Sequence, residues 1–149
     1  MNPHRNTLKT RLIVEPSSIK REWHLIDAKG QILGRISTQI AGFLAGRGKA
    51  SWSPMQDGGD HVVVINTAQV RLSGRKAETK RYYHHSTYLG HLKVKTFQQL
   101  QSEKPNEIVR KAVFGMLPRK RIRKTMLQRL HLYPADKHPY ADKIASKNA

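Results

Sequence analysis

The stretch "HVVVINTAQVRLSG", His61–Gly74, contains the longest apolar run of the chain, Val62–Ile65. The side chains of a strand point alternately to its two faces. A strand that consists entirely of apolar residues is therefore expected to be covered on both faces. Strands of this kind are typical of mainly parallel sheets with helices packed against them. The stretch therefore predicts an α/β protein built around this strand.

The preceding segment, "REWHLIDAKGQILGRISTQIAGFLAGRGK" (Arg21–Lys49), has the pattern of a strand, a turn and a helix. Trp23–Ile26 predicts a short strand, and the turn-forming residues Asp27–Gly30 follow it. From Leu33 onward apolar residues recur at helical spacing until Gly46, where the helix is expected to end. This order agrees with the α/β prediction.

The second half of the chain is predicted to be mainly helical. "TFQQLQSEKPNEIVRKAVFGMLP" (Thr96–Pro118) predicts a short helix, a break at Pro105 and a second helix that begins at about Glu107. A third, basic helix is expected from about Arg119 to Leu130. Further strands are expected around Val70, Leu72 and Tyr83.

No internal repeat or long linker divides the chain, and 149 residues are enough for one compact domain. We expect a basic N-terminal arm (1–19), one α/β domain (20–133) and an extended C-terminal tail (134–149). The arm lacks the apolar core of a secretory signal. No apolar run approaches the ~20 residues that a membrane-spanning helix needs, so no membrane partner is expected.

The chain is strongly basic, with 28 Lys and Arg residues against 10 Asp and Glu and a formal net charge of +18. A polyanionic partner would relieve the repulsion within so small a domain, so the composition indicates nucleic-acid binding. The chain has no cysteine. This excludes disulfides, Cys-based zinc fingers, iron–sulfur clusters and thiol catalysis.

Neither glycine-rich segment has the spacing of a phosphate-binding or dinucleotide-binding loop. In "GFLAGRGKAS" (Gly42–Ser51), Phe43 and Ala50 stand where a P-loop requires a glycine and a hydroxyl, and "DGGD" (Asp57–Asp60) has no G-x-G-x-x-G pattern. The acids are also few and scattered, whereas a metal-dependent nuclease needs them clustered. We therefore expect no catalytic residue, no metal and no cofactor.

The stretch "KRYYHHSTYLGHLK" (Lys80–Lys93) combines tyrosines and histidines with cations. His84 and His85 are adjacent, so in a strand they point to opposite faces and cannot chelate one ion. No carboxylate completes a ligand set there. A structural role for the rings stays open, but the composition favours bases stacked on the rings, with phosphates on the cations Lys80, Arg81 and Lys93.

The segment "PRKRIRKTMLQRL" (Pro118–Leu130) holds six cations and no acid. No i,i+4 ion pair can therefore balance the charge. An apolar arc predicts that this helix packs on the core and directs most of its cations outward, where they suit phosphates. A solvated face and a membrane-surface helix are the alternatives, and the arc lacks the aromatic anchors of the latter.

Three blocks, "REWHLIDAKGQILGRISTQIAGFLAGRGKA", "DGGDHVVVINTAQVRLSGRKAETKRYYHHS" and "VFGMLPRKRIRKTMLQRLHLYP", resemble in order the main blocks of the large-subunit ribosomal protein L-thirteen family. The resemblance runs from about Lys20 to Tyr140. It implies a three-layer α/β/α domain with a mainly parallel central sheet and a structural, non-enzymatic role. The implied partners are large-subunit rRNA and neighbouring large-subunit proteins, with no homo-oligomer, on the ribosome of a bacterium or of a mitochondrion or plastid.

Carried onto this sequence, the resemblance implies that Asp57 and Asp60 shape the turn before the central strand. It also implies RNA contacts for a set of cations and polar residues, to which the two basic stretches add Arg81, Lys93 and Arg129. The implied residues are Arg47, Lys49, Arg75, Lys76, Lys80, Tyr83, His84, His85, Ser86, Arg119, Lys120, Arg121, Arg123 and Lys124. A regulatory RNA-binding protein that acts off the ribosome remains the alternative.

Overall fold

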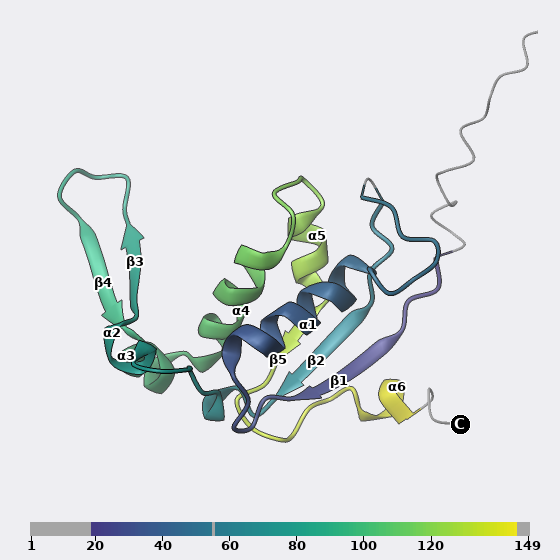
Figure 1. Cartoon of the computed structure of the whole chain (residues 1–149), viewed down its shortest axis with the longest axis horizontal. Helices are drawn as coiled ribbons and strands as arrows, with labels where there is room; N and C mark the ends of the chain where they lie inside the picture. Colours follow the sequence, from purple (N-terminus) through teal and green to yellow (C-terminus); the bar gives the residue numbers. More distant parts are fainter. Residues whose placement is uncertain (1–18, 55, 146–149) are drawn as a thin grey trace, which may run out of the picture.

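The computed structural model describes residues 19–54 and 56–145. Its centre is a three-stranded parallel sheet in the order β1 (Trp23–Asp27), β2 (His61–Ile65) and β5 (Leu130–Leu132) (Figure 1). The apolar run Val62–Ile65 is buried in the middle strand, as predicted. The mixed α/β class with a mainly parallel sheet is therefore confirmed.

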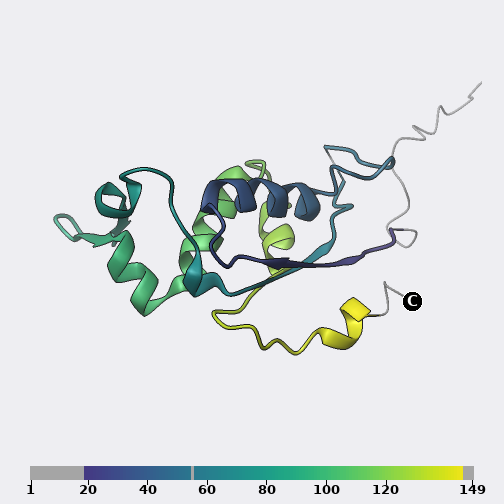
Figure 2. The same cartoon turned by 60° about the horizontal axis from the view of Figure 1, so that its bottom comes forward.

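Helices α1 (Leu33–Ala45), α4 (Pro105–Met116) and α5 (Arg123–Gln128) cover one face of the sheet (Figure 2). The helix predicted from Leu33 is confirmed, and Gly46 ends it in the left-handed conformation with φ 70°. Glycine is needed there for a second reason, because a Cβ on Gly46 would lie 2.8 Å from the carbonyl oxygen of Gly58.

The opposite face of the sheet is crossed by the C-terminal segment, which ends in the short helix α6 (Ala141–Ala145) (Figure 2). The rings of Trp23, His61, His131 and Tyr140 form a cluster here, with Trp23 and His61 stacked at 4.3 Å and Trp23 and Tyr140 at 4.9 Å between centroids. This face thus carries a thin layer of chain. The expected arm lies outside the described residues except for Ile19, as do residues 146–149 of the expected tail.

An antiparallel hairpin, β3 (Arg81–His85) and β4 (Leu92–Thr96), projects from the body (Figure 1). The short helix α2 (Lys76–Thr79) precedes the hairpin. Helix α3 (Phe97–Glu103) follows it and begins with a Thr96–Gln99 capping box. The strand expected around Tyr83 is therefore present. The strand expected around Val70 and Leu72 is reduced to one bridge between Ile32 and Arg71, next to the 3-10 turn η2 (Thr67–Gln69).

Two helix boundaries differ from the prediction. Pro105 is the first residue of α4, a position where proline is favourable because the amide hydrogen is not needed. The basic helix begins at Arg123, not near Arg119. The guanidinium group of Arg123 donates to the carbonyl oxygens of Leu117 and Pro118, just after α4, each at 2.9 Å, and so holds the start of α5 against the end of α4. No helix within the described ranges is long and apolar enough to cross a membrane.

Candidate nucleic-acid interface

Some of the cations predicted to bind RNA lie at the amino-terminal ends of the parallel strands, where they form ion pairs within the protein. We call Arg21, Lys49, Asp57, Asp60 and Arg129 the anchor cluster. Arg129, which is only 6% exposed, donates both terminal guanidinium nitrogens to the Asp57 carboxylate, with Nη1 2.6 Å from Oδ2. Its Nη2 also donates to the Leu44 carbonyl oxygen at 3.2 Å. Arg129 therefore holds the end of α1 and the start of β5 together.

Asp60 is the second acid of the anchor cluster and is 4% exposed. One carboxylate oxygen accepts the Glu22 amide at 2.9 Å and the Lys49 ammonium, and the other lies 3.2 Å from His24 Nε2. Burial alone would raise the pKa of Asp60, but the hydrogen bonds from Glu22, Lys49 and His24 together lower it. Lys49 is thus bound to an acid of its own chain. The resemblance implied that Asp57 and Asp60 shape the turn before the central strand; in the structure both carboxylates also bind cations from other segments of the chain.

The same acid belongs to the one group of residues that the described part of the chain offers for a metal ion, Glu22, His24 and Asp60. Their ligand atoms lie within 4.8 Å of one another. Both oxygens of Asp60 are already engaged by Lys49 and His24, so a metal would have to displace the ammonium group. The geometry favours a structural ion pair over a metal centre.

The turn between α4 and α5 carries cations of a different kind. We call Arg119, Lys120, Arg121 and Lys124 the basic turn; all four are exposed, and Arg119, Arg121 and Lys124 make no salt bridge within the described ranges. Lys120 donates to the Pro54 carbonyl oxygen at 3.1 Å. Arg123, by contrast, turns inward and stacks over the Phe114 ring at 4.5 Å.

The hairpin divides the predicted RNA-binding residues between its two faces. The register pairs Tyr83 with Val94 and His84 with Lys93, so successive residues point to opposite sides. The outer face carries Arg81, Tyr83 and His85, and Tyr83 is 62% exposed. The inner face faces α3 and α4 and carries Tyr82, His84, Ser86 and Lys93. His84 and His85 do not meet, as expected.

The remaining predicted cations are exposed or partly exposed. Arg75, just before α2, and Lys76, its first residue, are exposed. The Lys80 ammonium lies 5.5 Å from the centroid of the Tyr82 ring, and Arg47 is exposed just after α1. Sequence reasoning overlooked Trp52, which is 44% exposed and lines a cavity of about 260 Å³ with Arg47 and Lys120. A lone tryptophan in the polar stretch "GKASWSP" was the available signal.

The location of these groups within the fold is informative. Open α/β sheets normally bind small ligands beyond the carboxyl ends of their strands. Here the carboxyl ends of β1 and β2 are closed by a 2.9 Å hydrogen bond from Asn66 to Asp27. The basic turn, the hairpin tip and the loop after α1 all reach the upper edge of Figure 1, toward which the amino ends of the strands also point. The fold and this surface define a basic α/β protein that displays exposed cations and rings.

Comparison with known proteins identifies the family. The ribosomal protein L13 family model matches residues 21–139, and the chain belongs to this family. The chain is similar to the large ribosomal subunit protein uL13 of Roseiflexus sp. (strain RS-1), with 48% identity over 84% of this chain and 86% of that protein. It is also similar to the proteins of the same name from Nitratidesulfovibrio vulgaris (44% identity; 85% and 88% covered) and Geobacillus kaustophilus (38%; 89% and 92%).

Proposed function

We propose that this protein is a structural component of the large ribosomal subunit that binds large-subunit rRNA and supports subunit assembly and translation. The observation that carries the proposal is the basic turn, where the exposed side chains of Arg119, Arg121 and Lys124 project from a folded scaffold and make no salt bridge with a described residue. The names of the similar proteins, all large-subunit proteins of bacteria, support the same conclusion and a bacterial ribosome as the location. No described feature favours the off-ribosome alternative.

The proposed interface combines three parts with different roles. The basic turn and the cations beside α2 contact phosphates, the rings of the hairpin stack on bases or sugars, and the loop after α1 adds one further ring. Lys49, Arg123 and Arg129 are left out because they bind groups of their own chain and, unlike Lys120, are not fully exposed. The proposed interface consists of Arg47, Trp52, Arg75, Lys76, Lys80, Arg81, Tyr83, His84, His85, Ser86, Lys93, Arg119, Lys120, Arg121 and Lys124.

The proposal also assigns a role to each segment of the chain. Residues 20–133 are proposed as the rRNA-binding domain, with 1–19 as a basic arm and 134–149 as a tail. The proposed protein partners are neighbouring large-subunit proteins. No self-association and no catalytic step is part of the proposal.

Sedimentation of a native lysate through a sucrose gradient, before and after a high-salt wash, tests the proposal. The protein should remain with the large subunit after the wash, because salt weakens the phosphate contacts but does not screen the stacking of its rings on the folded rRNA. A protein that stays near the top of the gradient in both conditions would contradict the proposal and favour the off-ribosome alternative.

A further inference from the structure

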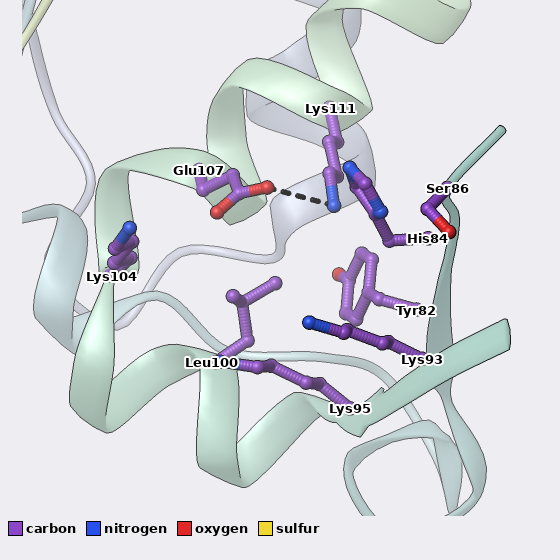
Figure 3. A pocket seen from close by; sticks show the side chains of 9 residues that line it. All are labelled: Tyr82, His84, Ser86, Lys93, Lys95, Leu100, Lys104, Glu107 and Lys111. Atoms are coloured by element: carbon purple, nitrogen blue, oxygen red, sulfur yellow. Dashed lines mark ion pairs between the residues drawn. The ribbon is translucent and has the colours of Figure 1, made fainter. Parts of the chain in front are cut away.

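The inner face of the hairpin and helices α3 and α4 enclose a pocket of about 380 Å³ (Figure 3). Helix α4 contributes Glu107 and Lys111, and Lys104 lies at the junction of the two helices. The pocket is within the size range of sites for small organic ligands. Its lining residues are Tyr82, His84, Ser86, Lys93, Lys95, Leu100, Lys104, Glu107 and Lys111.

The charge of the pocket is strongly positive. Four lysines line it against one acid, Glu107, which pairs with Lys111 at 2.8 Å (Figure 3). Lys95 pairs with Glu103 outside the pocket lining. Lys93 and Lys104 make no ion pair with any described residue, and Figure 3 shows them on different walls of the pocket. The pocket therefore has two ammonium groups left for an anionic ligand.

Two buried hydroxyl groups of the pocket also lack a partner. Tyr82 Oη and Ser86 Oγ are buried, and neither has a hydrogen-bond partner among the described residues. Buried polar atoms are nearly always hydrogen-bonded in folded proteins. Beside them, the Tyr82 ring and the buried Leu100 form an apolar wall. The ligand that fits has anionic ends, hydrogen-bonding groups and a flat or apolar part.

We propose that this pocket binds one nucleotide of an RNA chain. The phosphates on the two sides of the nucleotide contact Lys93 and Lys104, and its sugar or base lies against Tyr82 and Leu100. This inference rests on the proposed function and places a defined contact within it. A nucleotide in a chain fits better than a free anion, because the cations lie on different walls and the hairpin continues the basic surface beyond the pocket.

The bound nucleotide would also fix the hairpin. A two-stranded hairpin is at best marginally stable alone, and this one projects from the body with its outer face exposed (Figure 1). Ammonium groups on β4 and at the start of α4 would both hold the same nucleotide. RNA binding would thereby join the hairpin to the domain in one orientation.

The test compares two variants that each lose two charges. The pocket variant is Lys93→Gln with Lys104→Gln, and the matched control is Lys29→Gln with Lys137→Gln, two exposed lysines outside the proposed interface. Binding of the full chain to large-subunit rRNA is measured by filter retention over a salt series.

We expect the pocket variant to bind at least about tenfold more weakly, because charge-assisted hydrogen bonds are lost. Its salt slope should fall by about 1.4, for two phosphates of a single strand. The control should stay within about twofold of wild type.

Two further arms separate the alternatives. A variant of the basic turn, R119Q/R121Q/K124Q, is measured in the same assay. If it weakens binding while the pocket variant behaves like the control, the pocket inference is wrong and the proposed function stands. If neither variant weakens binding, the proposed interface fails as well. Titration with adenosine 5′-monophosphate is the last arm. Saturable binding of this free nucleotide, with rRNA affinity unchanged in the pocket variant, would overturn the RNA inference in favour of a site for a free anion.

Discussion

The anchor cluster and the basic turn contain the same types of cationic side chain, Arg and Lys, in opposite surroundings. In the anchor cluster, Arg129 and Lys49 each bind a carboxylate that is largely buried. In the basic turn, Arg119 and Arg121 are exposed and reach no acid in the described part of the chain. The difference lies in the acids, because the chain has few of them and the fold brings two to the amino ends of the strands. The position of the acids decides which cations remain for RNA.

The two regions should therefore respond differently to the loss of a charge. A charge removed from a buried pair leaves its partner without compensation in a poorly solvated place, which is costly. A charge removed from an exposed turn leaves water in its place and changes stability little. Substitutions can thus separate the contribution of charge to folding from its contribution to binding.

The largest effect is expected for Asp57→Asn. Arg129 would keep its charge and its burial but lose its carboxylate, so the free energy of unfolding should fall by about 3 kcal/mol. Urea denaturation measures the loss, and Asp136→Asn, an exposed acid, is the control. A loss of less than about 0.5 kcal/mol would mean that the anchor cluster does not stabilise the fold.

The basic turn should show the reverse behaviour. R119Q/R121Q/K124Q, which spares Lys120 because of its bond to Pro54, should change the free energy of unfolding by less than about 0.5 kcal/mol. The slope of rRNA affinity against salt should fall by about 2.7, about 0.9 for each phosphate of an rRNA duplex. The variant K29Q/R35Q/K137Q removes the same charge elsewhere and should keep the slope. Equal slopes in both variants would show that only net charge matters.

Acid should weaken the anchor cluster through Asp60. Its pKa is lower in the folded chain than its ordinary value of 3.8. Stability from the ionised carboxylate is therefore complete above about 3.8 and is lost as the pH falls through the folded-state pKa. Urea denaturation between pH 5 and pH 3 should show this loss in wild type, and a smaller one in Asp60→Asn. An identical pH profile in the two proteins would exclude Asp60 as the cause.

The smallest effect is expected in the cluster of Trp23, His61, His131 and Tyr140, where a new positive charge would lie near other cations. Burial lowers the pKa of His61 below its ordinary 6.5, and the positive charges of His131, Arg129, Arg21 and Lys143 lower it further. Burial and Lys143 do the same for the pKa of His131. Stability is thus complete above pH 6.5 and falls as the pH drops through the folded-state values.

Trp23 should report on the protonation of His61 and His131, because its ring stacks on both histidines. In a Trp52→Phe background, its fluorescence and the urea midpoint should change between pH 7 and pH 5. Both changes should shrink when His61 and His131 are replaced by Gln. Changes that persist in the Gln variant would assign the pH response to other groups.

Much of the fold could be predicted from local pattern. The buried strand around Val62–Ile65, the helix from Leu33 and its end at Gly46 follow from periodicity and from glycine chemistry, which depend on neighbouring residues only. The start of the basic helix could not be predicted in this way. It depends on Arg123 turning back to bond the end of the preceding helix. The position of Arg123 within the apolar arc of the predicted helix indicated that its side chain must snorkel or pair, but it did not identify these carbonyl partners.

The sequence alone determined that the chain is an α/β protein with far more cations than its own acids can neutralise, because composition and periodicity are properties of the chain itself. Only the tertiary structure decided which cations remain available. Arg129 and Asp57 are 72 residues apart and meet because β5 pairs with β2 in parallel. The two faces of the hairpin, and the pocket beneath it, likewise exist only once strands and helices pack. Ion pairing acts through space, so the sequence shows how much charge there is and the fold determines where it is used.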